Sequence, residues 1–382
     1  MFAIFDLNDD NYMKMPWALL VNTLPIIAKK LPDTKIYVLT DTKKCINVKK
    51  IIERENLKVL SLSRPVLRYP YRGLLSVLKT LNKMLNIDTL VAVCGWNIHK
   101  WGAIADRLKV SNLALIILTP LYHANELLKI SMETLPSLLK YGGFIDFIYF
   151  IKLIFENFVV RLILNLTKLV GKFSIIVFTE SEKKIFQRYG FKSHKVNIRL
   201  KFNAGQSYRF SGQCTDNPSI AYFGLPIVPR GYDIVVELAR NSSMNFVMYL
   251  REHLPMPARI RALLRDVNNN LKVIFKFFRS SNELISEAEK HHLILLPFRF
   301  VVSEFPLVVL EALCSGRLVV TTPYSNVRAI NAPNLIVLDF SQIKNPTSIE
   351  RLAKKNIKIV VDSCEIDWEF IANELIRILE LG

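Results

Sequence analysis

The pattern that most constrains the fold is a strand, a loop, a helix and a second strand between residues 292 and 322. The apolar run His292–Pro297 indicates a buried strand, and Ser315–Thr322 indicates a turn followed by another. Between them, Ser303–Ala312 supplies a loop that leads into a helix. A helix that joins two buried strands returns the chain to a parallel neighbour. The loop then lies at the carboxyl end of a strand, where open α/β sheets bind their ligands.

Two carboxylates belong to this segment, Glu304 in the loop and Glu311 on the helix. The first turn of such a helix offers unpaired N–H groups and the positive end of a dipole, which suit a phosphate. Glu311 can accept hydrogen bonds from vicinal hydroxyls, such as those of a ribose. The segment therefore predicts a phosphate-friendly site with a hydroxyl acceptor beside it.

The same alternation of strands and helices extends along the chain and predicts a parallel sheet in each half. In the first half we expect strands at 1–5, 35–40, 58–60, 89–94, 114–118, 174–178 and 195–200, and helices at 16–30, 74–85 and 101–108. In the second half we expect strands at 219–224, 246–250, 272–275, 293–296, 318–321 and 335–338. A polar stretch at 203–217 reads as a linker, so we expect domains at 1–205 and 206–366 and a final helix within 367–382.

Composition narrows the class of protein. Hydrophobic residues make up 51% of the 382 residues, which excludes a disordered chain. The five cysteines stand singly with no CxxC pair, which favours a reducing compartment and argues against structural zinc. The histidines show no metal-ligand spacing. The strand-like start is followed by Asp6, Asp9 and Asp10, so no signal peptide is expected.

The positive charge is concentrated in one half of the chain. Residues 1–205 carry 31 Lys and Arg against 15 Asp and Glu, whereas residues 206–382 carry 20 against 18. A basic half can attract nucleic acid, anionic lipid or a phosphorylated acceptor. A biased composition with a solvated lysine surface is the alternative, but it does not explain the confinement to one half. Helix-turn-helix and interleaved aromatic–basic motifs are missing, so nucleic acid is not an expected partner.

Residues 144–170 form an almost continuous apolar helix that charges interrupt before it could span a membrane. On a helical wheel the polar residues cluster on one side: Asp146, Asn157, Arg161, Asn165 and Lys168. Two interpretations follow. The helix either lies in the plane of a bilayer surface, or it is a core helix whose polar stripe faces water.

The segment at 303–312 resembles the nucleotide-sugar site of retaining GT-B glycosyltransferases, especially family four. That family has two glutamates seven residues apart, the second in a Leu-Glu-Ala context, which Glu311 matches. Ser303 stands at the first position and Glu304 lies one place later, so either Glu304 serves the sugar through a shifted loop or the first acid is lost. The fold implied is α/β, with two doubly wound Rossmann-like domains that face a central cleft.

Further residues carry the resemblance. A strand ends at Gly224, and Arg230-Gly231 matches the family's second basic–glycine pair, although Leu225 stands where the first arginine is common. His123 follows a buried strand, as does the family's histidine near the transferred sugar. The resemblance thus implies catalytic or sugar-contacting roles for His123, Ser303 and Glu304. It assigns the donor to Gly224, Arg230, Gly231, Phe305, Pro306, Leu307 and Glu311.

Other positions agree with or depart from the family. Phe178–Glu182 resembles the strand end near the domain junction. Asp367–Glu369 resembles the start of the closing helix, which in this family crosses back to the first domain. The loop at 7–14 has no glycine, and residues 322–326 replace a Gly-Gly turn. Arg299 and Arg328 are candidates for the missing phosphate-binding charge.

The resemblance implies a glycosyltransferase that moves a sugar from a nucleotide-diphosphate donor with retention and without a metal or other cofactor. The basic first half predicts that the acceptor is anionic or lipid-linked. It also predicts peripheral contact with an anionic membrane on the cytoplasmic side. An inactive GT-B-like protein that binds a ligand or partner is the alternative.

Overall fold

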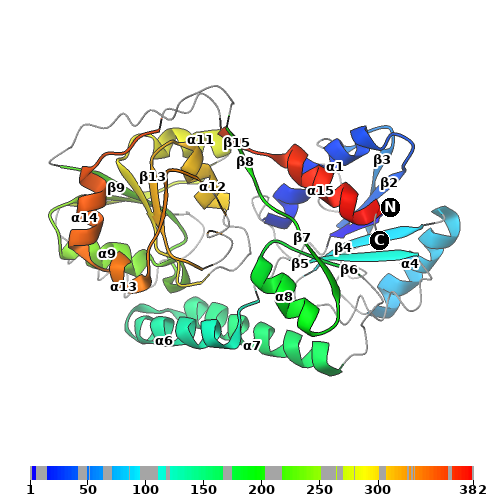
Figure 1. The fold of residues 1–382 in the computed structure, drawn as a ribbon, viewed down its shortest axis with the longest axis horizontal. Coiled ribbons are helices and arrows are strands. Elements are labelled where there is room, and N and C mark those ends of the chain that lie inside the picture. The colour runs from blue at the N-terminus through cyan, green and yellow to red at the C-terminus, as the bar shows by residue number, and fades with distance from the viewer. Residues whose placement is uncertain are drawn as a thin grey trace. The chain divides into compact units, whose positions relative to one another are not determined.

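The computed structural model describes residues 2–5, 15–41, 50, 52–62, 71–85, 87–94, 111–117, 121–166, 174–202, 217–250, 264, 270–278, 280–300, 307–324, 327, 330, 332–359 and 364–380. The chain divides into two compact units (Figure 1). Unit 1 contains Met1–Tyr122, Phe155–Arg199 and Asp367–Gly382, and unit 2 contains His123–Ile154 and Leu200–Ile366.

Unit 1 is built on a parallel sheet of seven strands in the order β3-β2-β1-β4-β5-β6-β7. The strands are β1 (Phe2–Phe5), β2 (Ile36–Asp41), β3 (Leu57–Leu62), β4 (Thr89–Cys94), β5 (Asn112–Ile117), β6 (Ser174–Val177) and β7 (Lys192–Lys195). Its helices are α1 (Met15–Lys30), α4 (Tyr71–Leu85), α8 (Glu180–Arg188), α15 (Trp368–Glu380) and the second part of α7 (Phe144–Leu166).

Unit 2 repeats this design with six parallel strands in the order β11-β10-β9-β12-β13-β14. The strands are β9 (Ser219–Gly224), β10 (Asn245–Leu250), β11 (Leu271–Phe275), β12 (Leu293–Leu296), β13 (Leu318–Thr321) and β14 (Leu335–Val337). The helical elements are α6 (Ala124–Tyr141), η1 (Val228–Arg230), α9 (Tyr232–Arg240), α11 (Ser281–Ala288), α12 (Leu307–Cys314), α13 (Phe340–Ile343), α14 (Pro346–Lys354) and the first part of α7.

The two sheets confirm the expected α/β class. All residues of β12 and β13 are buried, because helices shield both faces of a parallel sheet from water. In each unit the strand order reverses beside the first strand, between β1 and β4 and between β9 and β12. That reversal is the topological switch point of a doubly wound fold.

The closing helix starts where the sequence predicts. The Asp367 carboxylate accepts a hydrogen bond from the N–H of Phe370 at 2.9 Å, which caps α15 at its first turn. Lys30 at the end of α1 donates to Glu369 at 2.9 Å, so the two ends of the chain meet in unit 1. The units differ from the expected ranges 1–205 and 206–366 chiefly because His123–Ile154 groups with unit 2.

Two expectations for the first half were incomplete. The predicted strand at 195–200 is wrong, since β7 ends at Lys195 and β8 (Leu200–Phe202) pairs with β15 (Cys364–Ile366) in a separate antiparallel ribbon.

Helix α6 was not predicted. Its start nevertheless carries a signal, because the Glu126 side chain three residues on accepts the N–H of His123 at 2.9 Å, half of a capping box.

Helix α7 confirms the expected apolar helix, but its orientation is the reverse of the core interpretation. The polar residues Asp146 and Asn157 are 1% and 0% exposed. Asn157 accepts the N–H of Tyr122 at 2.9 Å, and Arg161 donates to the carbonyl of Tyr122. Asp146 and Asn157 of the polar stripe therefore face the protein instead of water.

A disulfide joins Cys314 at the end of α12 to Cys364 at the start of β15, with Cα atoms 5.0 Å apart. The partners are separated by 50 residues, so their spacing gave no sign of the pair. The bridge runs against the reducing compartment that the single cysteines favoured.

Candidate functional site

The loops after β9 and β12 meet at the switch point of unit 2. The loop after β9 contains η1 and ends at Gly231, whose φ of 75° lies in the left-handed region. A Cβ at this residue would lie 1.9 Å from the carbonyl oxygen of Pro297, which directly follows β12. Only glycine permits this contact. At Gly224 an added Cβ would lie 2.5 Å from the Tyr222 hydroxyl, so this position also excludes a side chain.

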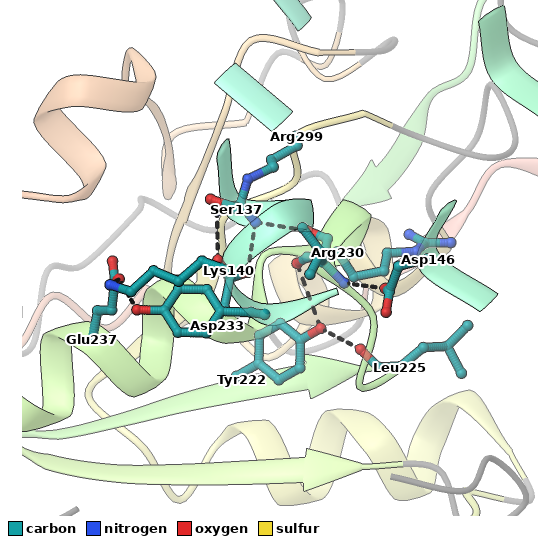
Figure 2. Close-up of polar contacts among 11 residues, drawn as sticks. Ser137, Lys140, Asp146, Tyr222, Leu225, Arg230, Asp233, Glu237 and Arg299 are labelled. Atoms are coloured by element: carbon teal, nitrogen blue, oxygen red, sulfur yellow. Dashed lines mark hydrogen bonds and ion pairs between the residues drawn. The ribbon is translucent and has the colours of Figure 1, made fainter. Parts of the chain in front are cut away.

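Arg230 is the last residue of η1 and is half-buried. Its guanidinium lies over the ring of Phe298, with Cζ 5.0 Å from the ring centroid, in a cation–π arrangement. The Tyr222 hydroxyl donates to the carbonyl of Leu225 at 2.9 Å and fixes the turn before η1 (Figure 2). Arg230 thus lies in the loop to which the sequence assigned a phosphate contact.

Arg299, by contrast, is not available for a phosphate. It is 0% exposed and makes a bidentate ion pair with Asp233, with both N–O distances 2.6 Å. It also donates to the carbonyl of Val228 at 2.7 Å and to the Ser137 hydroxyl at 2.8 Å (Figure 2). The expectation that Arg299 could replace the missing cation is therefore wrong, because Asp233 already neutralises it. Arg328 lies outside the described residues.

Helices α6 and α7 contribute to the same corner of unit 2. The Asp146 carboxylate accepts the N–H of Val228 at 2.6 Å and that of Gly143 at 2.7 Å. Burial raises the pKa of Asp146, and these two N–H groups oppose the rise. On α6, Lys140 pairs with Glu237 of α9 at 3.3 Å, and Tyr141 donates to the same carboxylate. These contacts attach the helical segment to the loop that carries Arg230.

Glu311 is a second buried charge, on the helix that joins β12 to β13. Glu311 is 8% exposed, and its carboxylate accepts one hydrogen bond from the Ser281 hydroxyl at 2.7 Å. Burial raises the pKa of Glu311, and the bond from Ser281 opposes that rise. A carboxylate has about four acceptor positions. Within the described residues this one uses a single protein donor, so it retains capacity for ligand hydroxyls.

The remaining expected site residues have different outcomes. Leu307 is the first residue of α12, one turn before Glu311. His123 precedes α6 as its N-cap residue, and nothing in its contacts tests the sugar role. Ser303, Glu304, Phe305 and Pro306 lie outside the described residues.

Three of the polar residues in this unit had no sequence signal that singled them out: Ser137, Asp233 and Ser281. Asp233 lies two residues after the motif Arg230-Gly231, but its partner Arg299 is 66 residues away. Ser281 follows Ser280, whose hydroxyl caps α11 by accepting the N–H of Glu283 at 3.3 Å. The Ser-Ser-Asn-Glu run predicts that cap, although not the contact with Glu311.

No group of three or more His, Cys, Asp or Glu side chains among the described residues is arranged to hold a metal ion. No described helix is both long enough and apolar enough to cross a bilayer.

Comparison with known proteins identifies the fold. No family model and no curated protein sequence matches the chain. Among solved structures, Anabaena HepE in complex with UDP-glucose is 14% identical with a TM-score of 0.54, covering 100% of this chain and 94% of that one. The apo lipopolysaccharide outer core galactosyltransferase WaaB is 10% identical with a TM-score of 0.60, covering 100% and 95%. A glycosyltransferase from Rickettsia africae is 10% identical with a TM-score of 0.57, covering 99% and 93%. The chain therefore has the GT-B fold of these proteins.

Proposed function

We propose that the protein is a glycosyltransferase that moves a sugar from a nucleotide-diphosphate donor to an acceptor. The observation that carries this proposal is Glu311, a buried carboxylate with spare acceptor capacity beside the switch point of a doubly wound sheet. Its environment suits the vicinal hydroxyls of a ribose, because hydrogen bonds to a charged acceptor are worth about 1.5–3 kcal/mol each.

The other donor contacts follow from the same edge of the sheet. Arg230, which is held over the ring of Phe298, is suited to the diphosphate because a guanidinium can bind phosphate oxygens through two N–H groups. Gly224 and Gly231 keep side chains away from the loop that approaches it. We assign Phe305, Pro306 and Leu307 to the donor as well, with the N–H groups in the first turn of α12, which begins at Leu307, as partners for the distal phosphate. We assign the sugar to His123 and to either Glu304 or Ser303.

We further propose transfer with retention at the anomeric carbon and stabilisation of the leaving diphosphate by Arg230 and the start of α12 instead of a metal. The acceptor we propose is an anionic or lipid-linked glycan at the cytoplasmic leaflet. The basic balance of residues 1–205 supports an anionic acceptor.

A donor screen tests the proposal directly. HepE was solved with UDP-glucose, so UDP-sugars come first, followed by GDP- and ADP-sugars, with binding measured by calorimetry and turnover by released nucleotide. We expect one nucleotide class to bind, and EDTA to leave turnover unchanged. Binding without turnover indicates the inactive alternative, and absence of binding to every donor contradicts the proposed site.

The assignment of the sugar contact needs its own pair of variants. If the loop brings Glu304 to the sugar, Glu304→Gln reduces turnover by about 100-fold or more, in the range of a lost catalytic group. Ser303→Ala then has little effect. The reverse order assigns the role to Ser303, and the anomeric configuration of the product by NMR tests retention.

A further inference from the structure

Helices α6 and α7 carry apolar faces that no other part of the described structure covers. Ten of the thirteen exposed large hydrophobic side chains in the described residues lie on these two helices. On α6 they are Leu128, Met132, Leu135 and Leu139, and on α7 they are Phe144, Ile148, Ile151, Phe155, Phe158 and Leu162. Scattered single residues of this kind need no explanation, but a concentrated set does.

The exposed side chains on each helix share one face. Successive members are three or four residues apart on both helices. This is the spacing of a single helical face. Phe144, the first on α7, is 81% exposed, and Phe158, fourteen residues on, is 64% exposed. Both helices thus present a continuous apolar strip over several turns.

The opposite faces hold α6 and the first part of α7 to unit 2. Ser137 on α6 receives its hydrogen bond from Arg299. Asp146 on α7 accepts the N–H of Val228, and Phe150 on the same side packs against Phe300 with ring centroids 6.3 Å apart. Because the polar groups face inward, the apolar strips are directed away from the protein. Water is an unfavourable neighbour for such strips, since exposed apolar area carries a free-energy penalty of about 25 cal/mol per Å².

Charge decides between the partners that could cover these strips. The chain carries a formal net charge of +18, and residues 1–205 account for most of it. Two copies repel each other, whereas an anionic bilayer attracts the chain. The helices themselves are balanced in charge, so they supply the apolar contact and the rest of the basic half supplies the attraction. Neither helix is of the membrane-crossing type, which leaves an orientation in the plane of the bilayer.

We propose that the apolar faces of α6 and of the first part of α7, both in unit 2, are a membrane-docking surface that inserts into the headgroup region of an anionic bilayer. The surface lies on different residues from Glu311 and Arg230. Docking therefore does not depend on the proposed transferase activity, and either can fail while the other stands.

Vesicle flotation with the full chain tests the docking surface. We expect the protein to float with vesicles of phosphatidylcholine and phosphatidylglycerol, several-fold less with phosphatidylcholine alone, and less in 0.5 M than in 0.05 M salt, since salt screens the attraction. The triple variant F144S/I148S/I151S should lose at least tenfold in partitioning. Phe275→Ser is the matched control, because Phe275 is 47% exposed in the same unit but lies outside both strips.

Fluorescence gives a second measurement that does not depend on a multiple variant. On vesicle binding, the fluorescence emission of the new tryptophan in Phe144→Trp should shift to shorter wavelength and should be quenched by brominated lipid. The emission of the tryptophan introduced by Phe275→Trp should do neither. Circular dichroism and thermal unfolding establish that each variant folds, and the single variant Phe144→Ser replaces the triple one if that fails.

Three outcomes overturn the proposal. The wild type stays with the soluble fraction for both vesicle types, or the triple variant and Phe275→Ser lose flotation equally. Alternatively, sedimentation shows a wild-type dimer that the triple variant dissociates without any binding to vesicles, in which case a second copy covers the strips.

Discussion

Arg299 and Glu311 are both charged and both buried in unit 2, yet their surroundings differ. Arg299 pairs with Asp233 through two hydrogen bonds and has two further acceptors, Val228 and Ser137. Glu311 has the Ser281 hydroxyl as its protein partner among the described residues. In the first arrangement Asp233 neutralises the arginine within the protein, so the charge is structural. In the second, the carboxylate has a neutral hydroxyl as its partner among the described residues, so neutralisation, and not burial, separates a packing charge from a candidate ligand contact.

The largest loss of stability is expected when the ion pair between Arg299 and Asp233 is broken. Arg299→Ala leaves the Asp233 carboxylate buried and unpaired, and should lower the free energy of unfolding by about 3–5 kcal/mol. Urea denaturation measures the change. The double variant R299M/D233L should recover much of the loss, because it removes both charges together. A loss below about 1 kcal/mol for Arg299→Ala would mean that the pair is not the anchor described here.

A smaller loss of stability is expected when the disulfide that joins α12, the helix of Glu311, to β15 is removed. Cys364→Ser opens the bridge to Cys314, and closing a loop of 50 residues stabilises a chain by about 2–4 kcal/mol. The difference from wild type should vanish in reducing buffer, where both chains lack the bridge. Equal unfolding curves without reductant would show that the two cysteines are not joined in solution.

Substitution of Glu311 should weaken donor binding without lowering the stability of the fold. Glu311→Gln should weaken donor binding by about 10- to 150-fold, the equivalent of 1.5–3 kcal/mol, as measured by calorimetry. The pKa of Glu311 is raised in the folded protein, so the ionised form opposes folding at neutral pH and this contribution declines as pH falls toward the unfolded pKa of about 4.3. The variant should therefore be at least as stable as wild type at pH 7.

Glu289→Gln, at an exposed position in the same unit, serves as a control with neither effect. If Glu311→Gln instead destabilises the fold and leaves donor affinity unchanged, Glu311 belongs with Arg299 as a structural charge.

The smallest effect is expected at Ser281. Ser281→Ala removes one neutral donor to Glu311 and should reduce donor affinity by less than about tenfold, since a single hydrogen bond contributes about 0.5–1.5 kcal/mol. Loss of this bond should raise the pKa of Glu311 further, which NMR titration can follow. A loss of affinity as large as that of Glu311→Gln would assign Ser281 a direct contact with the donor.

Much of the fold was predictable because most strands of the two parallel sheets are short and largely apolar. The predicted strands 89–94, 219–224, 293–296 and 318–321 agree with β4, β9, β12 and β13 at both ends. The left-handed φ of Gly231 and its contact with Pro297, which exclude any side chain, were not predicted from the motif Arg230-Gly231.

Contacts between distant residues were not predictable in the same way. The role of Arg299 depends on Asp233, 66 residues away, and the bridge of Cys314 depends on Cys364. Helix α7 had the expected polar stripe, but periodicity gives the existence of a stripe and not the side on which the protein lies. Asp146 and Asn157 face inward because backbone N–H groups of Val228 and Tyr122 offer them partners there.

The sequence by itself determined most strand positions of both sheets and the helix that carries Glu311, because these follow from local apolar runs. Tertiary structure decided which charges are neutralised, which cysteines pair and which face of α7 is covered. Each of these depends on a partner brought close by folding, and the partner's position is not encoded in the spacing of neighbouring residues.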